Sequence, residues 1–287
     1  MSRIAYVNGR YLPHAEARVH IEDRGFQFAD GVYEVVAVMA GRLVDEAGHL
    51  DRLERSLREL SIAEPVSRRV LQLVMRELIR RNRIRDGIVY MQVTRGTAAR
   101  DFRFPKGVRP TLVLTAKRLA NFGTPEAVAS GVAVVSMPDI RWLRRDIKSV
   151  ALLAQALGKQ RAAEAGAYEG WQVAEDGTVT EGCSSNSWIV TGKGTLVTRE
   201  PSTMILNGVT RLSLLRLARG MGIPVEERPF TIAEAQGAAE AFMSAATALV
   251  LPVTRIDGAA VGSGRPGPVT LRLREAYLAY ANAEGAS

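Results

Sequence analysis

The stretch Asp146-Ile147-Lys148-Ser149-Val150 lies where a strand-like segment passes into a long helix, which the apolar pattern predicts over residues 149–166. On the N-terminal side of this stretch, the chain is predicted to form strands first and helices afterwards. On its C-terminal side, short strands alternate with helices. Because runs of strands followed by runs of helices are typical of α+β proteins, the sequence predicts an α+β fold.

Before the lysine stretch, Asn8-Gly9 is a strong hairpin turn signal between two short apolar runs. An amphipathic helix is predicted near 48–61, and a second, basic helix follows Pro65. We expect strands at 4–7, 11–12, 32–39, 43–44, 88–95 and 111–116.

The segment Asn121-Phe122-Gly123-Thr124-Pro125 is predicted to be a linker, because Gly and Pro interrupt regular structure. It separates an N-terminal α+β domain over 1–120 from a C-terminal domain over 126–287. In the second domain we expect strands at 132–137, within 170–199, and at 224–228, 241–244 and 250–255, with helices from near Val209 and over about 268–282.

Composition narrows the class of protein. Of 287 residues, 47% are hydrophobic, yet no apolar run approaches the ~18 residues of a membrane span. The N-terminus has no apolar signal segment, so we expect a cytoplasmic protein with no membrane partner. A single cysteine, Cys183, excludes an intramolecular disulfide and is expected to be a small buried or turn residue. With only three histidines, no metal-ligand spacing appears.

The net charge of +8 raises the alternative of a basic nucleic-acid-binding protein. Much of the excess is arginine between Arg68 and Arg85, on the predicted basic helix. Since the apolar residues there recur at helical spacing, the arginines are expected to form its solvated face. No nucleic-acid motif accompanies them, so no nucleic-acid partner is expected.

Lys148 is the first candidate for chemistry. A lysine that acts as a covalent nucleophile must be held rigidly and must be partly neutral, and a site where a strand meets a helix offers such a position. Glu181, in Thr178-Val179-Thr180-Glu181-Gly182-Cys183-Ser184-Ser185-Asn186, suits an acidic partner for a protonated pyridine nitrogen. Taken singly, the first is an ordinary surface lysine and the second an ordinary turn carboxylate.

A phosphate site is suggested by Ile205-Leu206-Asn207-Gly208-Val209-Thr210-Arg211, where the chain turns into a helix. The first N–H groups of a helix lack partners and favour an anion, so the N–H groups of Val209 and Thr210 and the Thr210 hydroxyl suit a phosphate. Thr210 is equally an ordinary helix-start residue. Thr247, after the small residues 244–246, offers a further hydroxyl.

These stretches follow one another in the same order in a known family, together with Glu22-Asp23-Arg24-Gly25-Phe26-Gln27-Phe28-Ala29-Asp30-Gly31-Val32-Tyr33-Glu34. Over nearly its whole length the chain resembles the branched-chain and D-amino-acid aminotransferases, the fold type IV pyridoxal-phosphate enzymes. The resemblance implies a smaller N-terminal α+β domain, a larger C-terminal domain, pyridoxal 5'-phosphate between them, and a homodimer.

The resemblance also implies residue roles. Lys148 would form the internal Schiff base and shuttle the substrate proton, Glu181 would pair with the pyridinium nitrogen, and Leu206 would pack on the ring. Arg52, in His49-Leu50-Asp51-Arg52-Leu53, matches the family's phosphate-binding arginine. Val209, Thr210 and Thr247 would complete the phosphate site.

Within the family, the stretches at 31–36 and 95–105 look most like D-amino-acid aminotransferases. Tyr33 and Arg100 would bind the substrate carboxylate, but Phe102 stands where D-specific members usually carry histidine. The implied reaction is a ping-pong conversion of a D-amino acid to a 2-oxo acid, with pyruvate or 2-oxoglutarate as acceptor. Branched-chain L-transamination, (R)-amine transamination, aminodeoxychorismate lyase activity and a non-catalytic scaffold remain alternatives.

Overall fold

A computed structural model describes residues 3–284 and divides the chain into two compact units. Unit 1 contains the chain up to Ala120 together with Ile147–Ala151. Unit 2 contains Asn121–Asp146 and Leu152–Ala283. Lys148 therefore belongs by its contacts to unit 1, although it follows the predicted linker in sequence.

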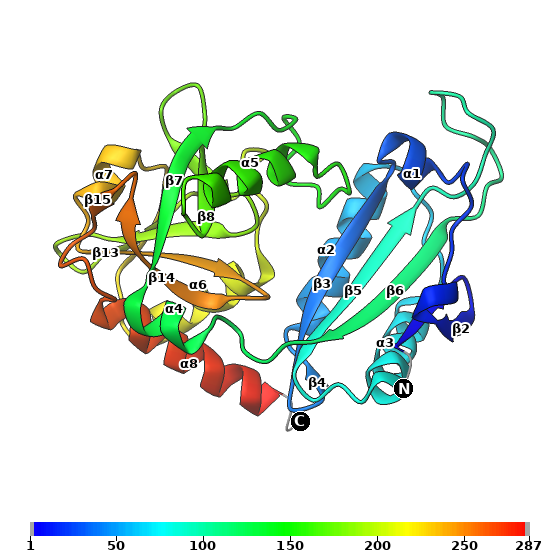
Figure 1. Cartoon of the computed structure of the whole chain (residues 1–287), viewed down its shortest axis with the longest axis horizontal. Coiled ribbons are helices and arrows are strands. Elements are labelled where there is room, and N and C mark those ends of the chain that lie inside the picture. The colour runs from blue at the N-terminus through cyan, green and yellow to red at the C-terminus, as the bar shows by residue number, and fades with distance from the viewer. Residues whose placement is uncertain (1–2, 285–287) are drawn as a thin grey trace. The chain divides into compact units, whose positions relative to one another are not determined.

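Unit 1 is built on one six-stranded antiparallel sheet in the order β2-β1-β6-β5-β3-β4 (Figure 1). Asn8 and Gly9 both have positive φ, which gives the tight turn of the first hairpin, as the sequence predicted. The strands are β1 Ile4–Val7, β2 Arg10–Pro13, β3 Gly31–Met39, β4 Arg42–Leu43, β5 Gly87–Thr94 and β6 Thr111–Arg118.

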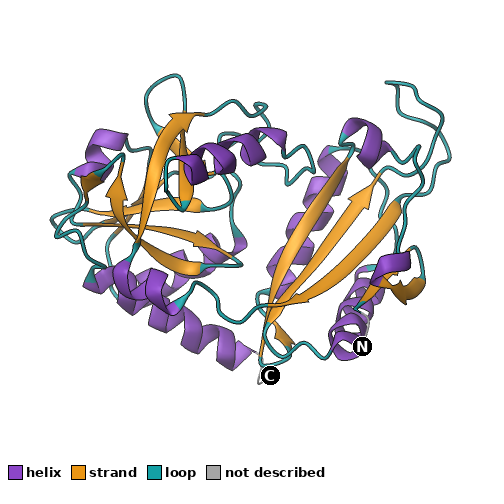
Figure 2. Cartoon of the chain, viewed as in Figure 1, coloured by secondary structure: helices purple, strands orange, loops and turns teal. Residues whose placement is uncertain are grey.

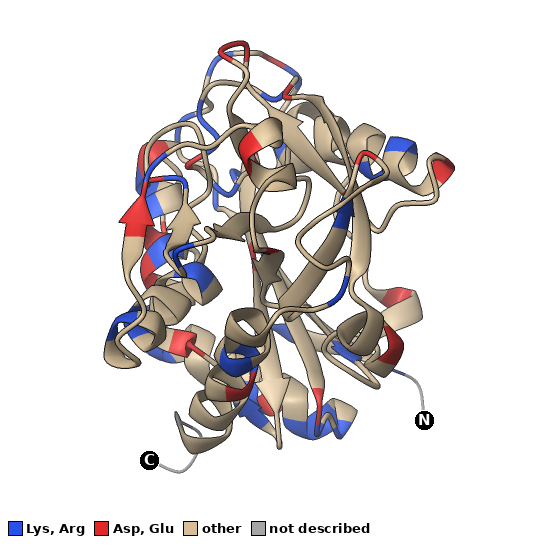
Figure 3. Cartoon of the chain, turned by 90° about the vertical axis from the view of Figure 1, so that its left-hand side faces the viewer, with Lys and Arg blue, Asp and Glu red and all other residues tan. Residues whose placement is uncertain are grey.

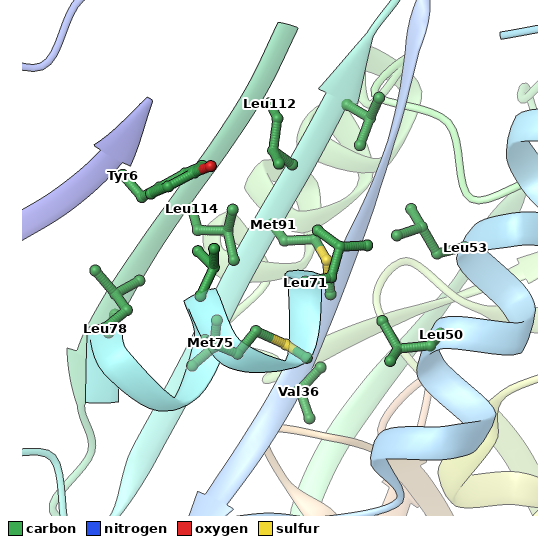
Figure 4. Packing of buried hydrophobic residues seen from close by; sticks show 14 of the residues in the cluster. Tyr6, Val36, Leu50, Leu53, Leu71, Met75, Leu78, Met91, Leu112 and Leu114 are labelled. Carbon is green, nitrogen blue, oxygen red and sulfur yellow. The ribbon is translucent and has the colours of Figure 1, made fainter. Parts of the chain in front are cut away.

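Two long helices, α2 (Glu46–Glu59) and α3 (Arg68–Asn82), pack against this sheet, and α1 (Arg24–Phe28) and a 3₁₀ turn (His14–Glu16) are short. The leucines of α2 recur every three or four residues at Leu50, Leu53 and Leu57, so they share one face. Figure 4 shows this face meeting α3 and the strands in one apolar core. Each fully buried leucine contributes roughly 1.5–3 kcal/mol to folding.

Unit 2 contains a nine-stranded mixed sheet with the main order β12-β11-β10-β13-β14-β7-β8-β9, and β15 pairs with β14. Its core includes the fully buried Trp171 and Phe230, whose rings meet edge to face. The strands are β7 Val132–Pro138, β8 Glu169–Val173, β9 Val179–Gly182, β10 Asn186–Val190, β11 Leu196–Thr198, β12 Val225–Glu227, β13 Glu240–Ala245, β14 Leu249–Ile256 and β15 Ala259–Ala260.

The helices of unit 2 are α4 Pro125–Ser130, α5 Leu153–Glu164, α6 Val209–Gly220, α7 Ile232–Gln236 and α8 Pro268–Glu284. Figure 2 shows helices and strands in both units, so the predicted α+β class is confirmed. Within residues 3–284, no helix combines the length and the apolar character needed to cross a membrane.

One predicted helix boundary is wrong. The helix predicted over 149–166 begins only at Leu153 and ends at Glu164, because the residues before it pair with a strand of unit 1. A short helix, α4, begins at the last residue of the predicted linker: the Thr124 hydroxyl accepts the N–H of Ala127 and caps a helix that has Pro125 in its first turn. The short helices α1 and α7 carry too little periodicity to be predicted.

Candidate active site

The segment that carries Lys148 lies along the edge of β3 like an additional short strand. The N–H of Tyr33 donates to the carbonyl of Lys148 at 3.0 Å, and the N–H of Val150 donates to the carbonyl of Gly31 at 3.0 Å. Val32 and Ser149 form an antiparallel bridge between these bonds. The backbone on both sides of Lys148 is therefore fixed, as a covalent nucleophile requires.

The Lys148 side chain is half-buried and packs against an aromatic ring. Its Nζ atom lies 4.3 Å from the centre of the Tyr33 ring, which stacks on the Tyr90 ring at 5.7 Å. Burial raises the pKa of Tyr90 to about 12, so its hydroxyl stays protonated and donates to Gln92. Among the described residues no carboxylate pairs with Lys148, and the structure thus brings together two of the predicted site residues, Lys148 and Tyr33.

Glu34 follows Tyr33 in β3, so its side chain lies on the face of the sheet opposite to that of Tyr33, where it binds Arg52. The Nε and Nη2 atoms of Arg52 donate to the two Glu34 carboxylate oxygens at 2.7 and 2.8 Å. His49 Nδ1 lies 2.7 Å from the same carboxylate. Burial alone would raise the pKa of Glu34, but Arg52 and His49 outweigh it and hold that pKa well below its usual range. Arg52 is therefore fixed as a charged fork.

Arg100 lies on an exposed loop and rests on an aromatic ring. Its guanidinium carbon is 4.8 Å from the centre of the Phe28 ring, and the Phe102 ring packs on Phe28 at 5.5 Å. In residues 3–284, no carboxylate pairs with Arg100. Arg103 is paired with Asp101 at 2.6 Å, so its charge is already compensated.

In unit 2, the buried Glu181 of β9 is clamped from two sides. Arg141 Nη1 donates to it at 2.5 Å, and the N–H of Leu206 contacts both of its oxygens at 3.1 and 3.2 Å. The amide of Asn186 donates to it at 3.1 Å. Burial raises the pKa of the Glu181 carboxyl above its ordinary value, although Arg141 opposes this shift. A buried carboxylate of this kind is further stabilised by a cationic partner.

Arg141 is itself fixed by a second buried acid. Asp139 accepts from Arg141 Nη2 at 2.7 Å, lies 2.9 Å from Arg145 Nε, and accepts from the Thr180 hydroxyl at 2.7 Å. The segment 139–145 thus buries the side chains of Asp139, Arg141 and Arg145, whereas Trp142 and Leu143 remain exposed.

The N-terminus of α6 has no side-chain cap. Its N-cap is Gly208, which has no side chain to satisfy the first N–H groups, and Val209 and Thr210 follow it. A Cβ atom at Gly208 would come within 2.1 Å of Asn186 Oδ1, so the backbone here approaches β10 closely. Because Asn186 also donates to the Leu206 carbonyl at 2.9 Å, one asparagine ties this turn to Glu181.

The remaining candidates differ in position. Leu206 is half-buried beside Glu181, and Thr247 is exposed in the turn between β13 and β14. Cys183 is buried, as predicted, and burial raises its pKa to about 11.

Sequence reasoning missed the groups that hold the candidates, chiefly Glu34, Asp139 and Arg141. Glu34 and Asp139 both lie in predicted apolar strands or at their ends, where a carboxylate is unexpected unless it is paired. A carboxylate in or next to a predicted apolar strand therefore indicates a buried ion pair. Nothing local to Arg141 points to Glu181, which lies 40 residues later.

Comparison with known proteins places this chain in a family. The amino-transferase class IV family matches residues 31–256. The chain is 41% identical over 269 residues to a D-alanine aminotransferase of Bacillus licheniformis, covering 94% of both proteins. It is 37% identical to a D-alanine aminotransferase of Staphylococcus aureus (strain MSSA476), covering 96% of both.

Solved structures of similar proteins agree with this family. The branched-chain amino acid aminotransferase of T.th., with pyridoxamine 5'-phosphate, is 27% identical and matches with a TM-score of 0.91 over 98% of this chain and 95% of that one. The Escherichia coli branched-chain amino acid aminotransferase, 24% identical with a TM-score of 0.88, covers 98% of this chain and 95% of its own and shares the fold.

The chain therefore belongs to the class IV aminotransferases. The predicted family, the type IV fold, aminotransferase activity and pyridoxal 5'-phosphate as cofactor are confirmed. The role of each individual site residue stays a prediction.

Proposed function

We propose that this enzyme converts a D-amino acid, D-alanine foremost, to its 2-oxo acid and passes the amino group to pyruvate or 2-oxoglutarate. The D-alanine aminotransferases that resemble it over almost their full length support this assignment. The structural observation that carries it is Arg100, whose exposed guanidinium has no acid partner among the described residues and so suits a substrate carboxylate.

The residues fit pyridoxal 5'-phosphate chemically. We assign its phosphate to Arg52 and to Val209, Thr210 and Thr247, because a guanidinium fork and an uncapped helix N-terminus both favour a phosphate. Glu181, a buried carboxylate held in one orientation by Arg141 and by the N–H of Leu206, is assigned to the pyridinium nitrogen, and Leu206 beside it to the ring face. When bound, the cofactor supplies an electron sink for the substrate carbanion.

Lys148 is assigned as the residue that holds the cofactor covalently and moves the proton. Its backbone is fixed and its Nζ atom lies against the Tyr33 ring, so we infer that this amine moves the substrate α-proton. In the described part of the chain no carboxylate pairs with this amine, so no acid competes with a ligand for it. Tyr33, directly against Nζ, is assigned to the substrate side of the lysine.

We propose that the enzyme is a cytoplasmic homodimer without nucleic-acid or membrane partners. Exposed apolar side chains such as Phe26, Phe102 and Leu143, each more than 70% exposed, favour a covered surface. The arginines of α3 are largely paired with acids, as Arg80 and Arg81 are with Glu77. Figure 3 shows acidic and basic residues interspersed, which disfavours a phosphate-backbone partner.

The decisive experiment mixes cofactor-loaded enzyme separately with D-alanine, L-leucine and (R)-1-phenylethylamine, and follows the visible absorbance of the bound cofactor. We expect rapid conversion with D-alanine only. Conversion mainly with L-leucine or with the amine would replace the proposed substrate class and remove Arg100 from the carboxylate site. Light scattering of the same sample tests the dimer, which a monomeric mass would refute.

A further inference from the structure

A buried cluster of three charges lies at the start of β3 in unit 1. Arg24 Nε donates to Asp30 Oδ2 at 2.7 Å, and Arg95 donates to the two Asp30 oxygens at 2.8 and 3.0 Å. The side chains of Arg24, Asp30 and Arg95 are only 3%, 10% and 8% exposed. Burying three charges is expensive, and two cations compete for one carboxylate, so simple stabilisation does not explain the cluster.

Arg24 extends from this cluster to the loop that carries Arg100. Its Nη1 atom donates to the backbone carbonyl of Asp101 at 2.6 Å, directly between Arg100 and Phe102. Its guanidinium carbon also lies 4.6 Å from the centre of the Phe28 ring, the ring on which Arg100 rests at 4.8 Å. One side chain thus holds the backbone next to Arg100 and supports the ring beneath it.

The rest of the loop is fixed from the same place. The N–H of Arg24 donates to the carbonyl of Gly96 at 2.9 Å, and Asp23 and Thr97 form an antiparallel bridge. The guanidinium of Arg95 lies 3.6 Å from the centre of the Phe104 ring at the far end of the loop. Both arginines that bind Asp30 therefore reach into the loop, one at Asp101 and one at Phe104.

The charges also leave Arg100 uncompensated. Asp30 is shared by Arg24 and Arg95, and Asp101 is paired with Arg103. Arg100 shares the Phe28 ring with Arg24 and has no carboxylate of its own among the described residues. An anion from outside the loop is the remaining way to balance it, and it binds best where the guanidinium is already oriented.

We propose that Arg24, held by Asp30, is a positioning residue that orients Arg100 for the substrate carboxylate. This inference rests on the proposed function of Arg100. Arg24 acts through the loop backbone and the Phe28 ring and does not itself bind substrate. Lysine cannot replace it, because one ammonium group cannot hold Asp30, the Asp101 carbonyl and a ring face together.

The test compares Arg24→Lys with Arg81→Lys as the matched control, because Arg81 also lies over a ring, Tyr11, at 4.2 Å and pairs with a carboxylate, but on α3. Four quantities are measured on the cofactor-loaded enzyme: KM and kcat for D-alanine, the inhibition constant of acetate, and the rate at which hydroxylamine, a nucleophile without a carboxylate, reacts with the bound cofactor.

We expect Arg24→Lys to raise both the KM for D-alanine and the inhibition constant of acetate about tenfold. A misplacement of about 1 Å can cost about a hundredfold, and the backbone bonds at Gly96 and Thr97 still hold part of the loop. The hydroxylamine rate and the urea midpoint of unfolding should remain at the wild-type values, and Arg81→Lys should change nothing. Equal losses for D-alanine and hydroxylamine, or no change in either carboxylate constant, would overturn the proposal.

Arg100→Ala separates this inference from the function on which it rests. If Arg100→Ala impairs D-alanine and acetate selectively but Arg24→Lys does not, only the positioning role is wrong. If Arg100→Ala spares both carboxylates, the proposed carboxylate site is wrong, and the positioning role falls with it. Should Arg24→Lys not fold, Phe28→Leu removes the shared ring instead, and an unchanged acetate constant in that variant overturns the proposal.

Discussion

Replacing Glu34 by glutamine tests how strongly the buried charges of unit 1 hold the fold. The change keeps the shape of the side chain but removes the charge that accepts two bonds from Arg52 and lies 2.7 Å from His49. The new amide also places a donor against donors. Removing one partner of a buried ion pair costs about 3–5 kcal/mol, which is a large part of a total stability of roughly 5–15 kcal/mol.

The assay is urea unfolding followed by two signals. All three tryptophans, Trp142, Trp171 and Trp188, lie in unit 2, so their fluorescence reports on that unit, whereas far-ultraviolet circular dichroism reports on both. With an m value of about 2 kcal/mol/M, Glu34→Gln should lower the midpoint of the unit 1 transition by roughly 2 M. Glu77→Gln, which removes the half-buried partner of the exposed Arg80, is the control and should leave the midpoint unchanged.

The effect must also depend on pH. Because the folded-state pKa of Glu34 lies well below its ordinary value of 4.5, its contribution is fully present above about pH 4.5 and is lost as the pH falls below that. The difference between wild type and Glu34→Gln should therefore shrink in acid. A midpoint shift below about 0.5 M at pH 7, or a difference that grows in acid, would refute the reasoning.

Further predictions concern three candidate site residues, Lys148, Glu181 and Arg52, and the buried Cys183. Lys148→Ala should abolish turnover and the absorbance of covalently held cofactor, and turnover at the wild-type rate would remove Lys148 from catalysis. Glu181→Gln should weaken cofactor retention in dialysis and slow α-proton removal, measured with α-deuterated D-alanine; unchanged values would contradict its role. Arg52→Ala should raise the cofactor dissociation constant about tenfold, and an unchanged constant would exclude it from the phosphate site. Because burial raises the pKa of Cys183 to about 11 from 9.0, its thiolate fraction at pH 8 should be about a hundredfold lower than that of an ordinary thiol. A rapid reaction of the native thiol with Ellman's reagent would show that the thiol is not protected by burial.

The sequence predicted most elements of the fold because periodicity is a local property. The leucines of α2 and the Asn8-Gly9 turn are visible in a short window, and both form as expected. The helix start at 149 failed for the opposite reason. Ser149 and Val150 pair with residues of β3 more than a hundred positions earlier, and no local pattern shows that pairing.

The candidate site also contains residues that the local sequence predicts and residues that it does not. Lys148 and Glu181 stand in recognisable motifs, so the sequence identified them. The sequence did not predict the ion-pair partners of Arg52 and Glu181, because an ion pair can join residues that are distant in sequence. Glu34 lies 18 residues from Arg52, and Arg141 lies 40 residues from Glu181. Their partners became evident only when the strands brought them together.

The balance of charge differs between the residues that we propose to hold the cofactor's charged groups and those that we propose to exchange partners during the reaction. Arg52 and Glu181 each have a buried opposite charge within hydrogen-bond distance, which fixes them in one orientation. Lys148 and Arg100 contact aromatic rings instead and have no carboxylate partner within residues 3–284. Moving a cation away from an aromatic ring costs only about 0.5–2 kcal/mol. Separating a buried ion pair costs more, about 3–5 kcal/mol. A group that must exchange one partner for another during each turnover is therefore better placed on a ring than on an acid.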